Sequence, residues 1–334
     1  AADSLMNGSL MARTTLITGS SGGLIGATYF RQIHAAALRD STIHTGSASY
    51  LDDMSADVLN PVAFSFVTND MFIRYRRVSD GRFLYTMDRG TAFEQRMNEL
   101  THGRLDIRLA DMADDERAAR LPMLVITPTS TNDGRRLLIS AQPIAYLNRI
   151  TSEAEHTSTP QPESIEFSRL FDGHAPDQLK LSSALRMSST FPYITPVVTL
   201  PSEPPMRVMD SGIRDNYGYR TTLQYLRAFE DWIAQNTRGV VILQVRDKQR
   251  DLEVKPAGGS IWGRLLDPVG NVYSNFVRSQ DQDYDLMLRM LGSGLRVPLE
   301  VIDLQLRHDE TDEISLSWHL TALKKRHVLN TIDS

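Results

Sequence analysis

TTLITGSSGGLIG, residues 14–26, combines a short apolar run, a glycine-rich turn and the start of a helical pattern. Residues 14–18 have the composition of a buried strand, and apolar side chains then recur at roughly helical spacing as far as residue 39. The apolar members of that stripe are Leu24, Ala27, Ile33 and Ala37. A strand, a tight turn and a helix in this order are typical of α/β proteins.

The turn contains the pattern G-x-S-x-G, from Gly19 to Gly23, with Ser21 at its centre. A serine held on such a turn between a strand and a helix projects above the sheet, where its hydroxyl can meet a carbonyl group. We expect the flanking residues Gly19, Gly22 and Gly23 to be glycine because larger side chains would clash in so sharp a turn. Ser21 is therefore the candidate nucleophile.

Ser21 also lies at the first turn of the predicted helix. Unpaired backbone amides and the helix dipole favour negative charge at that position. We therefore expect the amide of Gly22 to help stabilise the oxyanion that forms when the serine attacks an ester.

A second motif places Asp210 directly after a short apolar strand, residues 207–209, and before the small residues Ser211 and Gly212. The carboxyl ends of strands in an open α/β sheet converge on the ligand crevice, so we expect Asp210 to face Ser21. A carboxylate bonded to a serine hydroxyl can accept its proton and return it to the leaving group, provided that its pKa is raised. Taken alone, Asp210 would be interpreted as a turn residue that bonds its own backbone.

Further apolar runs have the length of buried strands: 123–127, 239–245 and 299–304. The run 123–127, the turn Asn132-Asp133-Gly134 and residues 137–140 predict a hairpin, since Asp-Gly tolerates positive φ. Helices are predicted at 221–235, 272–291 and 321–331. Together these patterns predict a three-layer α/β/α sandwich around a central sheet that is mostly parallel but mixed.

We expect one domain over residues 1–334, and we expect that sequence upstream of residue 1 is missing, because the first residues resemble a cut inside a helix or loop. Residues 41–119 carry many Met, Phe and Arg residues without a clear strand pattern, and we interpret them as a helical insertion or cap. Residues 151–163 are rich in Ser, Thr, Glu and Pro and are predicted to form an exposed loop.

The composition argues against a nucleic-acid partner, a metal site and a membrane-spanning helix. The net charge is −5 and the basic residues are scattered, which argues against a nucleic-acid partner. The chain contains no Cys and no H-E-x-x-H or H-x-H pattern, so we expect no metal site. No apolar run approaches the roughly 20 residues of a spanning helix, and we expect a soluble chain in the cytoplasm or associated with a membrane.

Three motifs in order resemble those of the patatin-like phospholipases and lipid acyl hydrolases. They are the elbow 19–25, the stretch 184–192 that ends before Pro196, and Asp210-Ser211-Gly212 with Asn216. The resemblance covers residues 16–245 and is closest to larger bacterial members. It implies a dyad of Ser21 and Asp210, hydrolysis of a lipid or small acyl ester, an α/β/α sandwich, and neither metal nor cofactor.

Two departures from this family pattern stand out. Ser211 occupies a position where the family usually has glycine, although a small side chain still permits the turn. The family's glycine-rich oxyanion loop precedes the elbow, and the first twenty residues contain no such run. The chain alone is then either truncated or without a complete oxyanion hole, which leaves open a degenerate domain that binds lipid or a partner without turnover.

A dinucleotide-binding turn is the main rival interpretation of residues 18–26. The glycines at 19, 22, 23 and 26 do not match G-x-G-x-x-G, and no apolar strand leads into Asp40, the acidic residue about twenty positions later. No tyrosine is followed four residues later by lysine, as a short-chain dehydrogenase requires.

Several other residues are candidates. His308 or His319 would complete a Ser-Asp-His triad in the chain order of α/β-hydrolases. Arg74, Arg76 and Arg77 form a local basic patch that could contact anionic lipid head groups at a membrane surface, although such a patch is more often an ordinary solvated face. Met71, Phe72, Phe83 and Tyr85 are candidates to line an acyl-chain pocket.

Overall fold

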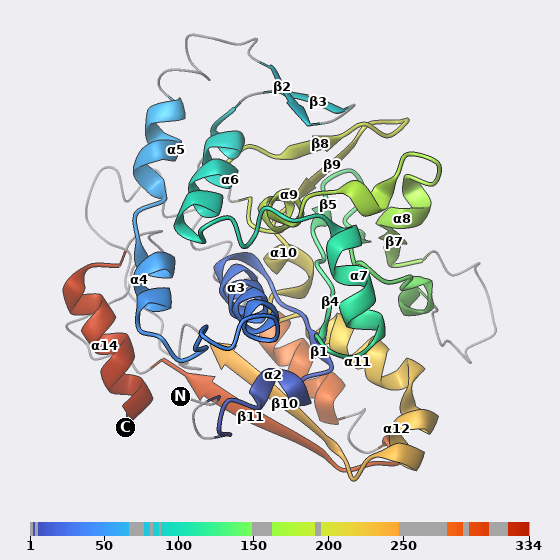
Figure 1. The fold of residues 1–334 in the computed structure, drawn as a ribbon. Coiled ribbons are helices and arrows are strands. Elements are labelled where there is room, and N and C mark those ends of the chain that lie inside the picture. Colours follow the sequence, from blue (N-terminus) through green and yellow to red (C-terminus); the bar gives the residue numbers. More distant parts are fainter. Residues whose placement is uncertain are drawn as a thin grey trace, which may run out of the picture.

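The computed structural model describes residues 3, 6–66, 77–80, 83–86, 88–148, 162–190, 195–246, 279–289, 294–306 and 320–333. They form an α/β fold in which helices pack against a mixed sheet (Figure 1). The strands are β1 Leu16–Ile17, β2 Arg77–Asp80, β3 Phe83–Thr86, β4 Met123–Leu124, β5 Thr129–Ser130, β6 Arg136–Leu138, β7 Ser164–Glu166, β8 Val198–Leu200, β9 Met206–Met209, β10 Val240–Arg246 and β11 Leu299–Gln305.

The helices alternate with these strands through most of the described chain. They are α2 Leu10–Arg13, α3 Ser21–Ala37, α4 Ser49–Ser55, α5 Leu59–Ser65, α6 Arg89–Leu100, α7 Leu109–Arg117, α8 Phe167–Leu170, α9 Leu181–Met187, α10 Gly212–Asp215, α11 Tyr219–Ala228, α12 Glu230–Asn236 and α14 Ala322–Asp333. Two 3₁₀ turns lie at Ala145–Asn148 and Pro176–Gln178. Residues 279–289 include one more helix.

One extended segment, residues 123–130, organises the part of the sheet that holds the site (Figure 1). The N–H groups of Met123 and Val125 donate to carbonyls of the β1 region, and the N–H of Thr131 donates to Arg207 on β9. Since alternate residues of a strand direct their hydrogen bonds to the same edge, β1 and β9 lie along one edge of this segment.

β1 and β9 run toward each other along that edge. β1 is parallel to the segment and ends with Ile17 opposite Leu124, whereas β9 is antiparallel and ends with Met209 opposite Thr129. Their carboxyl ends therefore face each other across the few residues between. This arrangement brings the turn after β1 close to the turn after β9.

β6 occupies the other edge of the segment and forms the predicted hairpin with it. The pairs Ile126↔Ile139 and Thr129↔Arg136 share one register. Gly134 has a φ of 73°, and its N–H donates to the carbonyl of Ser130 at 2.9 Å. The Asp-Gly turn therefore joins the two strands of a hairpin with a positive φ at its glycine, as the sequence predicts.

The sheet is mixed, as predicted, but the expectation that it is mostly parallel is wrong for the described strands. In the five-stranded order β7-β6-β5-β9-β8, only β6 and β7 are parallel. The parallel pairs β1–β4 and β10–β11 lie outside that order. The short connections β5–β6 and β8–β9 explain the difference, because tight turns can join only antiparallel neighbours.

Most predicted elements outside the site agree with the structure. β10, β11 and α14 lie where the apolar patterns place them, while the predicted helix at 221–235 divides into α11 and α12 around Phe229. Of the predicted helix 272–291, residues 279–289 are helical and the rest lies outside the described residues. In the interval 41–119, the antiparallel pair β2–β3 accompanies helices α4 to α7 and was not predicted.

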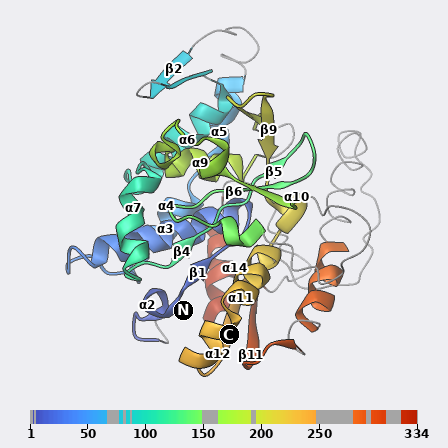
Figure 2. The ribbon, with the colours of Figure 1, turned by 90° about the vertical axis from the view of Figure 1, so that its right-hand side faces the viewer.

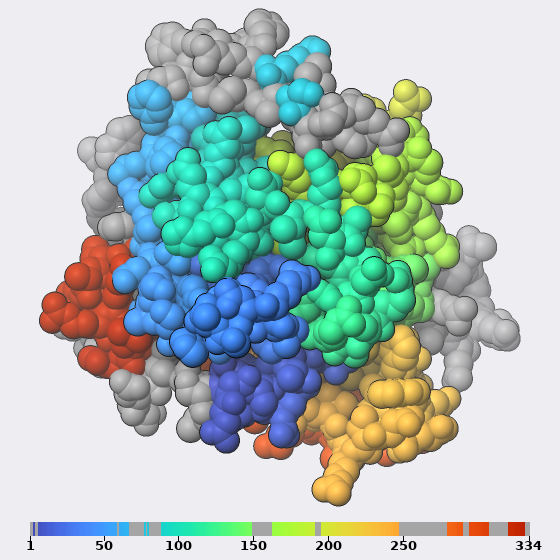
Figure 3. Space-filling model, viewed as in Figure 1, coloured from blue at the N-terminus to red at the C-terminus, as the bar shows by residue number. Residues whose placement is uncertain are grey.

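α3 packs its apolar stripe into the main core. Leu24, Ile25 and Ile33 are almost fully buried, and Leu24 and Ile25 join a cluster with Leu124 and Ile126 of the central segment. Helices of residues 49–117 lie beside α3 on the face of the molecule that Figure 3 shows. The helix that begins at Ser21 is therefore anchored in the main core by its apolar face.

Candidate active site

Ser21 occupies the turn where the chain leaves β1 and enters α3. Its φ of 49° lies in the left-handed region, which costs a residue with a side chain about 1–2 kcal/mol. Ser21 is partly exposed, and the next two residues, Gly22 and Gly23, are exposed. The turn therefore presents its serine to solvent at the amino end of a helix, as an elbow that serves a nucleophile must.

Asp210 follows β9 and is only 1% exposed. Its Oδ1 accepts a hydrogen bond from the N–H of Gly212 at 2.6 Å. Burial raises the pKa of the Asp210 carboxyl from its ordinary 3.8 to about 7, although the Gly212 N–H and the Ser21 hydroxyl both act to lower it. The carboxyl thus changes protonation state close to neutral pH.

The structure brings Ser21 and Asp210 together, 189 positions apart in the chain. The Ser21 hydroxyl lies close enough to lower the pKa of the Asp210 carboxyl as a hydrogen-bond donor. Oδ2 of Asp210, however, has no standard hydrogen bond to any of the described residues. A buried carboxyl group with a serine hydroxyl beside it is suited to accept the proton of that hydroxyl.

A single carbonyl group links the two turns. The carbonyl oxygen of Ser188 accepts a hydrogen bond from the N–H of Ser21 and another from the N–H of Ser211, both at 3.2 Å. Ser188 directly follows α9 and belongs to the stretch 184–192, whose residues 191–192 lie outside the described residues. The third motif of the sequence therefore contacts both of the others.

Side chains before Ser21 bind the loop beyond Asp210. The Ser20 hydroxyl donates to the backbone carbonyl of Asn216 and lies 3.1 Å from its Oδ1, and the Thr18 hydroxyl donates to the carbonyl of Gly218 at 3.2 Å. Gly218 has a φ of 69°, and a Cβ placed on it would approach the amide nitrogen of Gly19 to 2.6 Å. Only glycine fits between the two turns there.

A buried ion pair fixes the start of α11 behind this loop. Arg136 and Asp215 are both fully buried, and Nη1 of Arg136 lies 3.5 Å from Oδ2 of Asp215. The same Oδ2 accepts from the N–H of Thr221 at 3.0 Å and from its hydroxyl at 2.8 Å. Arg136 also donates to the Thr221 hydroxyl and to Gln224, although its Nε has no partner among the described residues. These contacts hold Asp215, the last residue of α10, against buried side chains.

The amides of the first helical turn are the candidate oxyanion donors. The N–H of Ser21 donates to Ser188 and that of Leu24 to Ser20, which leaves the N–H groups of Gly22 and Gly23 without partners among the described residues. Unpaired amides at a helix amino end bind anions. This arrangement supports the expected role of the Gly22 amide, which stays a prediction.

The steric argument for two of the elbow glycines is wrong. A Cβ placed on Gly22 or Gly23 would meet no atom of the described residues within 4 Å, and both glycines are exposed at the start of α3. Gly19 differs, since its φ of 156° is one that residues with side chains rarely adopt. The described part of the chain therefore leaves the space over Gly22 and Gly23 open.

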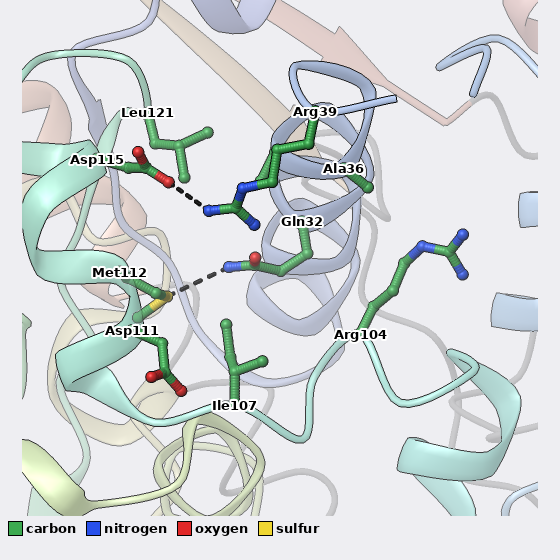
Figure 4. A pocket seen from close by; sticks show the side chains of 10 residues that line it. Gln32, Ala36, Arg39, Arg104, Ile107, Asp111, Met112, Asp115 and Leu121 are labelled. Carbon is green, nitrogen blue, oxygen red and sulfur yellow. Dashed lines mark hydrogen bonds and ion pairs between the residues drawn. The ribbon is translucent and has the colours of Figure 1, made fainter. Parts of the chain in front are cut away.

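A cavity of about 160 Å³ lies elsewhere, between the second half of α3 and α7 (Figure 4). Gln32 of α3 contacts Met112 of α7 across it at 3.2 Å, and Arg39, two residues after the end of α3, contacts Asp115 of α7 at 2.7 Å. Gln32 is eleven residues after Ser21, which corresponds to roughly 16 Å along a helix. This cavity is separate from the Ser21–Asp210 pair.

The structure describes only some of the remaining candidate residues from the sequence. His308, His319, Arg74, Arg76, Met71 and Phe72 lie outside the described residues, as do the side chains of Phe83 and Tyr85 on β3. Arg77 is exposed at the start of β2. The described part of the chain contains no group of His, Asp and Glu residues that could hold a metal ion.

Asp40 does not occupy the position that a dinucleotide-binding fold requires. It follows the end of α3 directly, with no strand before it, and its carboxylate accepts from the N–H of Thr42 at 2.9 Å. A ribose-binding acidic residue would stand at the end of a strand beside the phosphate turn. The dinucleotide-binding interpretation therefore lacks the acidic residue that would bind the ribose.

Sequence reasoning missed Ser20, Thr18 and Gly218 as parts of the site. Their only local signals are a hydroxyl next to the elbow and a glycine at the start of a helix, and both are common. Their roles arise from contacts between segments about 200 residues apart, which no local pattern encodes.

Among the described residues, no helix is both long enough and apolar enough to cross a membrane. The model of one protein family, described as patatin-like phospholipase, matches residues 1–223. No curated protein matches the chain. The matched region includes the elbow, the stretch 184–192 and the Asp210 loop.

Proposed function

The chain belongs to the patatin-like phospholipase family, and from this we propose that it is a serine acyl hydrolase that cleaves lipid acyl esters through Ser21 and Asp210. The observation that carries the proposal is the buried Asp210 carboxyl, whose pKa the nearby Ser21 hydroxyl acts to lower and whose Oδ2 has no standard hydrogen bond to the described residues. A pKa of about 7 suits a general base at neutral pH, since the carboxylate is available and still basic enough to take a proton.

In the first half of the reaction, Oγ of Ser21 attacks the acyl carbonyl carbon while its proton passes to Asp210. The oxyanion of the tetrahedral intermediate is stabilised by the N–H of Gly22 and by the amino end of α3. The ester C–O bond then breaks, and Asp210 returns the proton to the departing alcohol. The acyl group remains on Ser21.

In the second half, water attacks the acyl-enzyme and gives its proton to Asp210. The bond between the acyl carbon and Oγ of Ser21 breaks, Oγ regains the proton, and a carboxylic acid is released. Every proton transfer uses one carboxyl group, so the cycle needs no imidazole. We include in the proposal a three-layer α/β/α architecture, a lipid or small acyl ester as substrate, and contact with a membrane surface.

The test is hydrolysis of a chromogenic acyl ester together with labelling by a fluorophosphonate probe. Ser21→Ala should abolish both, and Asp210→Asn should lower kcat by about 10²–10⁴-fold. Ser47→Ala, which changes an exposed serine, should leave both unchanged. Full labelling of Ser21→Ala would refute the assignment of the nucleophile.

The same assay separates the alternatives that the sequence leaves open. Loss of activity in a His308 or His319 variant, with Asp210→Asn still active, would indicate a triad. Binding to lipid vesicles without any ester hydrolysis by the native full-length protein would indicate a binding domain. The dyad predicts hydrolysis that survives replacement of either histidine.

A further inference from the structure

The helix of residues 279–289 lies beyond the family match and contacts the loop that follows Asp210 (Figures 1 and 2, orange). Gln280 and Tyr284 stand one helical turn apart and share a face of this helix. Gln280 is 7% exposed and Tyr284 1% exposed, so both are buried against the α10 loop.

Both the nitrogen and the oxygen of the Gln280 side-chain amide form hydrogen bonds with that loop. Its Nε2 donates to the carbonyl of Gly212 at 2.8 Å and to that of Ile213 at 3.1 Å. Its Oε1 accepts from the N–H of Asn216 at 3.1 Å. One side chain therefore binds the beginning and the end of α10.

Tyr284 supports the same arrangement. Its hydroxyl lies 2.7 Å from Oε1 of Gln280 and 3.3 Å from Oδ1 of Asp215, and it accepts from the N–H of Asn216 at 3.1 Å. A hydroxyl has one proton to donate, and the shorter distance favours donation to Gln280. Tyr284 thus orients the Gln280 amide and adds a second contact to Asn216.

α10 needs such support because it is a single turn, Gly212–Asp215, and isolated turns are unstable in water. The α10 loop also contacts both the Asp210 carboxylate and the elbow that holds Ser21. Its Gly212 N–H binds Asp210, and the hydroxyl of Ser20, the residue before Ser21, binds Asn216. A shift of α10 would therefore move the carboxylate and the elbow relative to each other.

We propose that Gln280, oriented by Tyr284, is a positioning residue that holds Asp210 in register with Ser21. The inference rests on the proposed acyl hydrolase function. It assigns part of the catalytic geometry to a helix outside the region that the family model matches. Gln280 acts through α10 and does not touch the reacting atoms.

A positioning role differs measurably from a purely structural one. Misplacing reacting groups by about 1 Å can lower kcat by up to about 10²-fold, while substrate binding is unaffected. Loosening α10 also weakens the hydrogen bond from Gly212 to Oδ1, which now lowers the pKa of Asp210. The acid limb of the pH–rate profile should then move to higher pH, because the base is protonated over a wider range.

The experiment compares Gln280→Met, which conserves volume but removes every polar contact, with Gln280→Ala, Tyr284→Phe and the control Gln282→Ala. Gln282 is exposed on the same helix two residues away. Active sites are counted by fluorophosphonate titration, and kcat, KM and the pH–rate profile are measured per titrated site in the full chain. Melting temperatures are recorded for every variant.

We expect Gln280→Met to lower kcat by about 10- to 100-fold, with KM within about twofold and the acid limb at higher pH. Tyr284→Phe should show a smaller loss in the same direction, and Gln282→Ala none. If Gln280→Met matches Gln282→Ala in kcat per site and in pH profile, the positioning role is wrong, whatever its melting temperature. If Ser21→Ala still hydrolyses the ester, the proposed function fails instead.

Discussion

The hydroxyl of Ser20 lies 3.1 Å from Oδ1 of Asn216, a residue 196 positions further along the chain, and donates to the Asn216 carbonyl as well. This contact ties the residue next to Ser21 to the end of the loop that begins with Asp210. The relative position of the Ser21 and Asp210 side chains therefore depends on a contact that neither of them makes.

Ser20→Ala should lower the catalytic rate while changing the folding stability only slightly. Removal of one partly buried hydrogen-bonding hydroxyl costs only about 1 kcal/mol of folding free energy, whereas the elbow loses its link to Asn216. We expect kcat to fall clearly with little change in KM, measured by ester hydrolysis alongside urea unfolding. A Ser20→Ala variant with native kcat would show that the backbone contacts of Ser188 suffice.

The pH dependence of activity should follow Asp210. Because its pKa is about 7 and the base must be ionised, kcat/KM should rise with pH through about 7 and then level off. A pH–rate profile measured from pH 5 to 9 checks this expectation. An acid limb near pH 4 would mean that Asp210 is not the base or that its carboxyl is solvated during turnover.

The same carboxyl should limit stability at high pH. A pKa raised from 3.8 to about 7 means that the folded state holds a proton that the unfolded state releases, so stability falls as pH rises from about 4 to about 7. The penalty for the ionised form is at most about 4 kcal/mol. Asp210→Asn, whose amide oxygen can still accept from Gly212, should therefore be more stable than the native chain at pH 8.

Thermal unfolding of both proteins at pH 4 and pH 8 tests this prediction. The stabilising effect of Asp210→Asn should shrink toward pH 4, where the native carboxyl is protonated in the folded state. An equal effect at the two pH values would contradict a raised pKa.

Gly218→Ala should be strongly destabilising. An added Cβ would contact the Thr18 side chain and approach the Gly19 amide nitrogen to 2.6 Å, and the φ of 69° adds backbone strain. The matched control is Gly134→Ala, where φ is 73° but no atom lies within 4 Å of the added carbon. We expect about 1 kcal/mol for Gly134→Ala and several times more for Gly218→Ala, measured by urea unfolding.

Gly22→Ala and Gly23→Ala should fold normally, because the added methyl groups contact none of the residues that the structure describes. If an acyl ester occupies the space over these two glycines, these variants should raise KM while the melting temperature stays level or rises slightly. Gly26→Ala, one turn further along α3 and equally free of contacts, is the control and should leave KM unchanged. Unchanged KM in all three variants would place the substrate elsewhere.

Local patterns determined a large part of this protein. The elbow, the strand before Asp210, the Asp-Gly hairpin and the helices α3 and α14 all form where periodicity and turn residues predict them. Short-range rules suffice there, because strand, turn and helix preferences depend on neighbours within a few residues. The three motifs of the sequence also identified the family that the chain belongs to.

Tertiary contacts determined the rest. β1 and β9 meet end to end because both strands bond the same edge of residues 123–130. The register of such pairings depends on segments far apart in the chain. The pKa of Asp210 depends on burial among segments distant in the chain, and Gln280 reaches α10 from a helix 64 positions beyond Asn216. Sequence thus specified which groups could react, while folding set the distance, solvation and support of those groups.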